Sequence, residues 1–337
     1  MAGGGSKLAV YSAIVVNAVV TLVKFVAFAF TGSGAMLAEG MHSAADVGNQ
    51  ALLAVGMRKA ERAPDEDHPL GYGGEAFVWS LISAVGMFFL GSGVSITHGV
   101  QALAHGEHGE VMSQTLNLGI LGFSFVAEGL SFAVALNGMR MDARTHGQGL
   151  LEYFRKTDDP FGIAVLLEDS AAILGVTIAL VSVALTAATG NENWDSWGSI
   201  GIGSLLGLVA VFLVRKNRDL LIGRSVRPED RETLRRMLAE DPAVSEVKRA
   251  NAVVTGTSSY GVHTKLDFNG AYVAERVLDG TNLEALRREF ATDEQLRGYL
   301  LEFGERVVTQ VGREIDRIEA RIRETMPKAT RIDVEVD

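Results

Sequence analysis

Residues 35–57, AMLAEGMHSAADVGNQALLAVGM, carry polar side chains in a segment that is otherwise long and apolar enough to cross a membrane. These side chains are Glu39, His42, Asp46 and Asn49, and steps of three, four and three residues place them on one helical face. His42 and Asp46 lie one turn apart, so an imidazole nitrogen and a carboxylate oxygen can reach one divalent ion. Such mixed ligands suit Zn²⁺ in a tetrahedral site. Two ligands do not complete a site, so further ligands must come from elsewhere in the chain.

Other apolar segments also contain ionisable residues. The segment AVLLEDSAAILG contains Glu168 and Asp169. Because adjacent residues of a helix point about 100° apart, only one of these two can face His42 squarely. Glu128 lies in the segment FVAEGLSF, and Lys24 lies in the first apolar segment, where we expect its ammonium group to extend to the outer interface.

Ionisable groups within membrane segments are costly, and they usually face a pathway or a partner. Glu39 or Glu128 alone is as compatible with a structural hydrogen bond or an ion pair with a lysine, and a lone histidine is more often structural than a ligand. His42, Asp46 and Asp169 taken together, however, favour a pathway for metal ions or protons.

The hydropathy of the chain predicts two domains. Of 337 residues 47% are hydrophobic, and the mean hydropathy is +0.19, because an apolar first part is followed by a densely charged last part. We expect a transmembrane domain over 1–216 and a second domain over 217–337. The expected membrane helices, each of roughly 20 residues, cover about 8–30, 35–57, 77–103, 115–137, 162–187 and 198–215. The first lacks a clear cleavage site and is expected to remain as a membrane helix.

The linkers between these segments predict the orientation. Those after the second, fourth and sixth segments contain MRKAER, MRMDAR with YFRK, and VRKNR, whereas TGSG, HGEHGEVMS and ATGNENWDSWGS after the others contain no Lys or Arg. Positive charge is retained on the cytoplasmic side, so both termini are expected in the cytoplasm. We expect the protein to lie in the inner (plasma) membrane of a bacterium.

The second domain reads as a soluble α+β unit. An amphipathic helix in RPEDRETLRRMLAED is followed by two strand-like runs, VSEVKRANAVVTG and SYGVHTKLDFNGAYV. A long helix around 294–325 and a strand in TRIDVEVD end the chain. This order suits helices packed on one face of a small sheet.

Composition excludes several classes of function. A net charge of −10 without a basic stripe argues against nucleic acid as a partner. The absence of cysteine excludes disulfides and thiolate metal sites. An intramembrane metalloprotease is disfavoured because the sequence has no HExxH motif.

The motifs LAEGMHSAADVGNQALL and DEDHPLGYGGEAFVWSLISAVG resemble the cation diffusion facilitator family, and the likeness covers nearly the whole chain. VLLEDSAAILG and LLIGRSV resemble the branch that contains the mitochondrial zinc exporter of vertebrates. The resemblance implies an all-α bundle of six transmembrane helices, a cytoplasmic ferredoxin-like α+β domain and a homodimer. It also implies a transporter of divalent metal, mostly zinc.

The family's transport site maps onto this chain incompletely. Its pair in the second span matches His42 and Asp46, and the end of its motif in the fifth span matches Asp169. The position four residues earlier is Val165, which cannot bind metal. Glu168 is the leading replacement, and the other candidates are Glu39, Asn49, Glu128 or a water molecule.

Two further family sites match poorly. Asp65 and His68 occupy two positions of a metal site in the linker after the second span, but Tyr72 replaces its second histidine. We therefore interpret DHPLGYG as a turn that directs the third span. His263 is the sole histidine of the second domain. This domain therefore offers poor ligands for a regulatory metal.

The resulting hypothesis is a proton-coupled exporter of Zn²⁺ that works by alternating access. We expect no prosthetic group, because the divalent cation is the transported substrate. A carboxylate-rich site also suits Mn²⁺, Fe²⁺ or Co²⁺. The rival from another class is a membrane protein that binds metal without transporting it.

Overall fold

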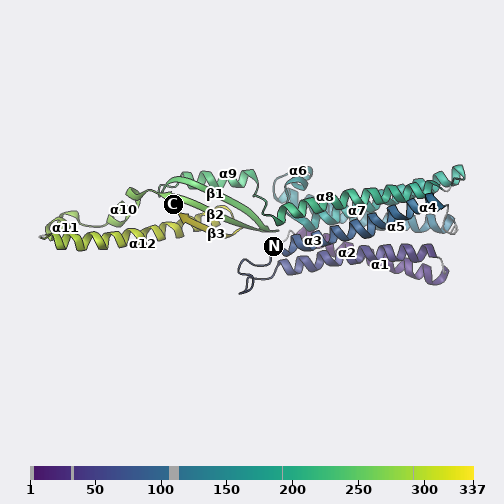
Figure 1. Cartoon of the computed structure of the whole chain (residues 1–337), viewed down its shortest axis with the longest axis horizontal. Helices are drawn as coiled ribbons and strands as arrows, with labels where there is room; N and C mark the ends of the chain where they lie inside the picture. The colour runs from purple at the N-terminus through teal and green to yellow at the C-terminus, as the bar shows by residue number, and fades with distance from the viewer. Residues whose placement is uncertain (1–3, 32–33, 106–113, 192, 291) are drawn as a thin grey trace. The chain divides into compact units, whose positions relative to one another are not determined.

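The computed structural model describes residues 4–31, 34–105, 114–191, 193–290 and 292–337 (Figure 1). The chain divides into two compact units: the first contains Met1–Ile222, and the second contains Gly223–Thr255 and Ser259–Asp337.

The first unit is built from long helices. They are α1 (Gly4–Thr31), α2 (Gly34–Ala60), α3 (Glu75–Gly86), α4 (Val94–His105), α5 (Gln114–Thr145), the short α6 (Leu150–Lys156), α7 (Pro160–Thr189) and α8 (Asn193–Leu221). Five helical segments of the described part are long and apolar enough to cross a membrane: 5–26, 75–104, 119–145, 160–189 and 193–221. With the more polar α2 they form the expected bundle of six spans, and most of these helices extend beyond the expected limits.

The third span is a single helical run with a change of pitch in its middle. Between α3 and α4 lies the π-helical segment η1 (Met87–Gly93), which contains two glycines. Wider π turns are uncommon and often occur near functional sites. The run therefore covers Glu75–His105 without a break.

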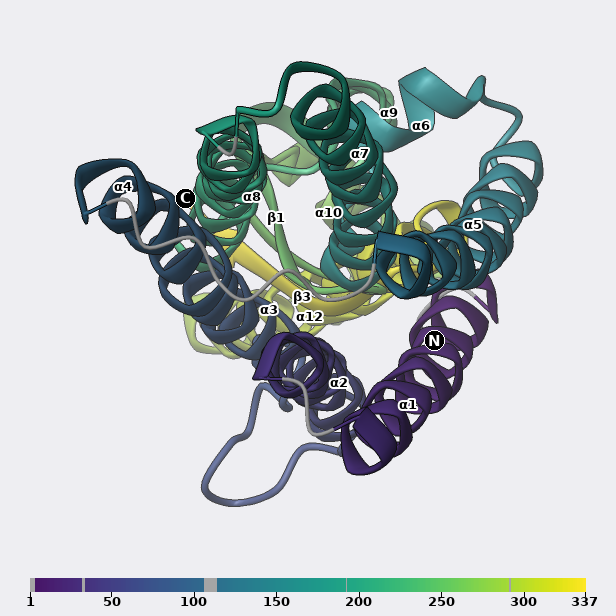
Figure 2. The same ribbon diagram turned by 90° about the vertical axis from the view of Figure 1, so that its right-hand side faces the viewer.

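The six spans form a closed ring (Figure 2). Around it α1 packs on α2, α2 on α3, the run α3–η1–α4 on α8, α8 on α7, α7 on α5, and α5 again on α1. Small residues allow close approach, as is common in membrane bundles. A Cβ atom on Gly5 of α1 would lie 2.8 Å from the carbonyl oxygen of Gly138 on α5, so only glycine fits there.

The local sequence explains where α7 begins and ends. Asp159 caps it by accepting a hydrogen bond from the backbone N–H of Phe161, and Pro160 occupies the first turn. Gly190 ends the helix with φ of 67°. These signals fix which residues of α7 lie at mid-helix.

The second unit contains α9 (Pro228–Ala239), β1 (Val244–Gly256), β2 (Ser259–Phe268), α10 (Gly270–Leu278), α11 (Leu283–Glu289), α12 (Asp293–Thr325) and β3 (Ala329–Val336). The sheet order is β1-β2-β3, with β2 parallel to β3. Leu234 and Leu238 of α9, Ile318 and Ile322 of α12, and Val262 and Leu266 of β2 are buried, so the helices cover the sheet with an apolar core.

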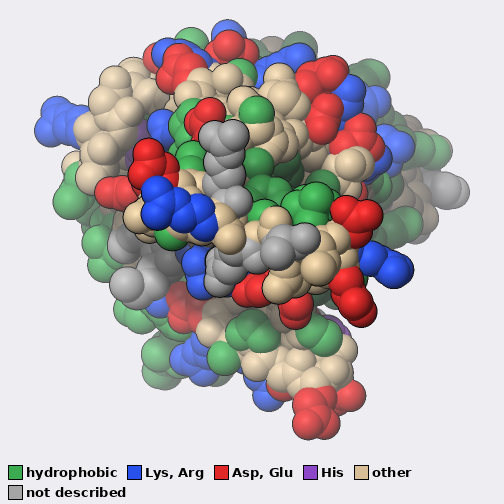
Figure 3. Space-filling view, turned by 90° about the vertical axis from the view of Figure 1, so that its left-hand side faces the viewer, with side chains coloured by type: hydrophobic (Ala, Val, Ile, Leu, Met, Phe, Trp, Pro, Cys, Tyr) green, Lys and Arg blue, Asp and Glu red, His purple; other side chains and the backbone are tan. Residues whose placement is uncertain are grey.

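The predicted second strand was too long. It ends at Phe268, because Asn269 accepts a hydrogen bond from the backbone N–H of Tyr272 and so caps α10. The region before α12 also contains the short helix α11. Figure 3 shows acidic and basic side chains interspersed on one end of the molecule, without a single-sign patch.

Candidate metal site in the helix bundle

Glu168 of α7 faces α2. Its side chain is 8% exposed, and its Oε1 accepts a hydrogen bond of 2.8 Å from Nδ2 of Asn49. The other oxygen, Oε2, is buried and accepts no hydrogen bond from any described residue. A buried carboxylate oxygen without a donor is costly, so this atom is available to a cation.

Asn49 is held in turn by the third span. Its Oδ1 accepts a hydrogen bond of 2.6 Å from Oγ of Ser83 on α3. The chain Ser83–Asn49–Glu168 therefore joins three helices and fixes the direction of the Glu168 carboxylate. In this arrangement Asn49 orients a neighbouring carboxylate.

Asp169, the next residue, faces a different helix. It is 1% exposed, and its Oδ2 accepts a hydrogen bond of 2.8 Å from Oγ of Ser131 on α5. The two adjacent acids thus diverge, as helix geometry requires: Glu168 points to α2 and Asp169 to α5.

Two more carboxylates belong to the same neighbourhood. Asp46 of α2 lies close enough to repel Glu168 and Asp169 electrostatically. Glu128 of α5 experiences repulsion from Asp46 and Asp169 and attraction from Lys24. Four carboxyl groups from three helices therefore share one part of the bundle interior.

These groups are not yet gathered around one point. Among the described residues, no three His, Asp or Glu side chains are close enough to hold one metal ion. His42 and Glu39 belong to α2, but their side chains lie outside the described part. The structure thus brings Asp46 near Glu168 and Asp169.

The prediction for Lys24 was wrong. Lys24 is 5% exposed and does not extend to an interface, because its Nζ donates a hydrogen bond of 2.8 Å to Oγ of Ser43 on α2. This partner could not be predicted from the sequence, because a serine within an apolar helix carries no sign of its hydrogen-bond partner. Lys24 supplies positive charge near the acidic neighbourhood.

Val165, one turn before Asp169, is fully buried. An apolar side chain therefore stands where the resemblance places a ligand. Sequence reasoning assigned no role to Gln50, Ser83 and Ser131, which are all buried near the acids or one turn from them. Gln50 could have been found by extending the spacing of His42 and Asp46 by four more residues.

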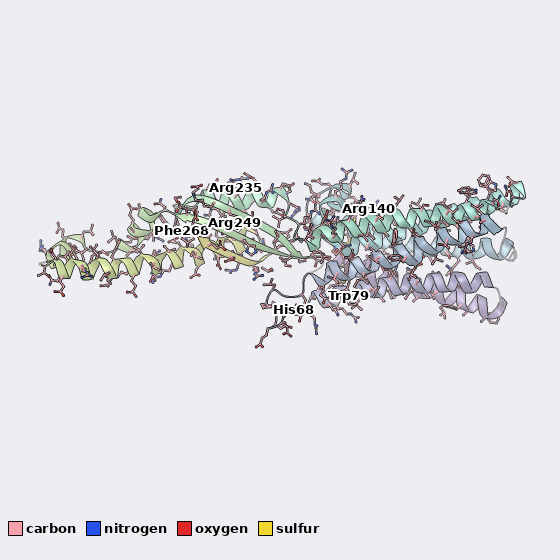
Figure 4. The ribbon with its side chains drawn as sticks, viewed as in Figure 1. His68, Trp79, Arg140, Arg235, Arg249 and Phe268 are labelled. Carbon is pink, nitrogen blue, oxygen red and sulfur yellow. The ribbon has the colours of Figure 1, made fainter. Side chains whose placement is uncertain are left out.

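Asp65 organises the linker between α2 and α3. His68, which is labelled in Figure 4, lies in this linker. The backbone N–H of His68 donates a hydrogen bond of 2.8 Å to Oδ1 of Asp65, and the Tyr72 hydroxyl donates one of 2.7 Å to Oδ2. The Tyr72 hydrogen bond and the backbone of His68 lower the pKa of Asp65. Both carboxylate oxygens therefore hold an exposed turn together.

His263 of the second unit lies opposite Asp333 in the parallel pair β2–β3, with 3.6 Å between Nδ1 and Oδ2. Both side chains are exposed. Two ligands at a sheet surface do not make a metal site.

A ring of membrane-spanning helices around buried acidic residues defines a multi-pass membrane protein with a charged interior. A family model described as the cation efflux transmembrane domain matches residues 10–222. The chain belongs to this family, the cation diffusion facilitators, and the resemblance seen in the sequence is confirmed.

Similar proteins extend the match to the second unit. The human protein named "Proton-coupled zinc antiporter SLC30A9, mitochondrial" is 36% identical over 335 residues, which is 98% of this chain but 59% of that protein. "Metal tolerance protein C4" of Arabidopsis thaliana is 38% identical over 98% of this chain and 73% of its own length. "Manganese efflux system protein MneP" of Bacillus subtilis is 25% identical over 65% of this chain. The chain thus spans about three fifths of the first relative.

Proposed function

We propose that this protein is a secondary transporter, not an enzyme, that exports a divalent metal cation in exchange for protons. The observation that carries the proposal is the buried Oε2 of Glu168, which accepts no hydrogen bond from the described residues and lies near Asp46 and Asp169. Negative charge gathered in low dielectric requires compensation by bound cations or protons.

In this proposal His42, Asp46 and Asp169 bind the ion, and Glu168 replaces the ligand lost at Val165. Asn49 orients Glu168 as the structure shows, and Glu128 and Glu39 are second-tier candidates. Asp65 and His68 of the linker take no part, because the carboxylate of Asp65 already holds the turn.

Exchange follows from competition for the same oxygens. Metal binding requires deprotonated ligands, so a metal ion entering on one side displaces protons, and protons entering on the other side displace the ion. A rearrangement that closes one side and opens the other, as in alternating access, then couples the two movements. The family membership and the relative named as a proton-coupled zinc antiporter support this scheme.

Zinc is the first candidate for the transported metal, supported by the name of that relative. Manganese, iron or cobalt is the second, because Val165 removes a nitrogen ligand and leaves a site richer in oxygen. The manganese efflux protein among the relatives is consistent with that alternative.

The Lys and Arg residues after α2, α5 and α8 support placing both termini, and the second unit, in the cytoplasm of a bacterial cell. The resemblance supports a homodimer in the plasma membrane. The rival hypothesis is a protein that binds metal in the membrane without transporting it. Such a protein would have the same metal site, so only a measurement of metal flux distinguishes the two.

Flux in proteoliposomes tests the proposal. The full chain, reconstituted with a pH gradient, is expected to move Zn²⁺ across the membrane, and collapse of the gradient should slow it. Parallel measurements with Mn²⁺, Co²⁺ and Fe²⁺ give the preference. Metal binding without flux would support the rival hypothesis.

A further inference from the structure

Gln50 of α2 is a fully buried amide whose side chain forms no hydrogen bond with the described residues. Its side chain is 0% exposed, and neither Nε2 nor Oε1 has a partner in the described part of the chain. Leaving a buried donor and acceptor unsatisfied is costly, and such groups in native proteins usually contact water or a ligand.

Another buried amide shows what a structural role looks like. Asn217 of α8 is 1% exposed, and its Nδ2 donates to Oγ of Ser80 on α3 at 3.1 Å and to the Leu213 carbonyl at 2.9 Å. These bonds tie α8 to α3. Gln50 makes no such tie, so its polarity needs another explanation.

Gln50 lies one turn beyond Asp46 along α2. The neighbouring Asn49 points to α7, where it donates to Glu168. On the other side of the same helical face, Ser43 contacts Lys24 of α1. Helical periodicity places Gln50 between the directions of Asp46 and Ser43, toward the interior of the bundle and α1.

A second buried amide on α1 lies level with Gln50. The contacts Lys24–Ser43 and Lys7–Glu61 show that α1 and α2 run in opposite directions. Seven residues before Lys24 is Asn17, and seven residues after Ser43 is Gln50. Asn17 is 4% exposed. Two uncharged amides therefore lie at the same depth on adjacent helices.

We propose that Gln50, together with Asn17, forms a binding station for a hydrated divalent cation between the carboxylate site and the Arg58 end of α2. This rests on the proposed transport function. Amide oxygens are ligands for hard cations, and the amide N–H groups can orient retained water. Without charge the station binds weakly, so an ion can enter it and still move on to Asp46.

Substitution of Gln50 separates this role from a structural one. Gln50→Met keeps the volume and removes both polar atoms. The apparent KM for Zn²⁺ in proteoliposomes is expected to rise about tenfold, the loss of one interaction with a charged group, with little change in maximal rate. The melting temperature of the full chain in detergent should stay the same or rise, because an unsatisfied group is removed.

Gln50→Glu provides the opposite perturbation. A charge at the station should lower the apparent KM and also the maximal rate, because the ion leaves more slowly. Asn217→Leu is the matched control: it removes bonded polar atoms, so the melting temperature should fall while the KM of the folded fraction stays unchanged.

An unchanged KM in Gln50→Met, or a lower melting temperature that matches Asn217→Leu, would overturn the station. Absence of Zn²⁺ flux in the unmodified protein would instead overturn the transport function itself. The two failures are therefore distinguishable in the same experiment.

Discussion

Buried carboxylates occur in both units, and their partners differ. In the second unit, Asp241 accepts hydrogen bonds of 2.9 Å from Nη1 of Arg317 and of 3.1 Å from Nη1 of Arg321. Glu314 accepts from Arg317 at 2.7 Å and from Gln310 at 2.9 Å. These charges are compensated within the fold.

In the helix bundle, two buried acids have neutral hydrogen-bond donors. Glu168 accepts from the amide of Asn49, and Asp169 accepts from the hydroxyl of Ser131. A neutral donor orients a carboxylate without neutralising it. The comparison shows that the buried acids of the second unit are paired with arginines, whereas Glu168 and Asp169 accept hydrogen bonds from neutral groups, an arrangement that leaves them able to exchange protons for metal in the proposed function.

The largest expected effect comes from removing an acid of the bundle. Asp46→Ala and Asp169→Ala should each lower Zn²⁺ flux by more than about 100-fold, since even outer-shell partners of metal ligands contribute 10–100-fold. The variants should still fold and insert, because alanine is well accommodated in a helix. Near-normal flux in either variant would remove that residue from the site.

The next effect concerns Val165. Val165→His should restore an imidazole one turn before Asp169 and raise the preference for Zn²⁺ over Mn²⁺. In that background Glu168→Ala should be better tolerated than alone, with a coupling of about 1 kcal/mol in a double-mutant cycle. The measurement is competitive transport by the parent, both single variants and the double variant. Strictly additive effects would mean that Glu168 does not replace the missing ligand.

The compensated acids should respond differently. Arg317→Ala should lower the stability of the second unit by about 2 kcal/mol, because the buried Asp241 loses charge-assisted hydrogen bonds. Amide hydrogen exchange of the full chain measures this. Arg306→Ala, which removes an exposed pair with Glu302, is the control and should cost less than about 0.5 kcal/mol. Equal effects would contradict the distinction between buried and exposed pairs.

The same network predicts a pH dependence. Burial alone would raise the pKa of Asp241, but hydrogen bonds from Arg317 and the Ala243 N–H lower it below its usual value. A depressed pKa stabilises the folded state above the unfolded value of about 3.9 and loses that contribution as the pH falls further. Protection of the second unit should therefore be constant near neutrality and decline in acid. The decline should be smaller in Arg317→Ala.

The smallest effects are expected outside the bundle. His68→Ala and, separately, His263→Ala should retain most of the flux. His68 contributes its backbone N–H to the linker turn, and His263 has one carboxylate nearby at the sheet surface. A loss as complete as in Asp46→Ala would place a required metal site in the linker or the second unit.

Sequence reasoning reached the six spans because long apolar segments and the distribution of Lys and Arg are strong signals. It also singled out Asp46, Glu168 and Asp169, which lie near one another in the structure, because carboxylates within apolar helices are conspicuous. It missed the hydrogen bonds of Ser83 and Ser131, since a serine in a helix carries no sign of its partner. The direction of Lys24 was wrong for the same reason: the partner lies on another helix.

The end of β2 shows another limit. Periodicity continued the strand to Val273, but the side chain of Asn269 caps a helix there. A capping hydrogen bond depends on backbone geometry, and a single polar residue within an alternating run does not reveal it.

Proton release on zinc binding tests the central claim most directly, because it detects whether the acids of the helix bundle exchange protons for metal. When Zn²⁺ is added to the full chain in weakly buffered detergent solution, the protein should release protons in proportion to bound metal. The release should be lost in Asp46→Asn/Asp169→Asn and kept in Arg317→Ala. Zinc binding without proton release, or equal release in the double variant, would contradict it.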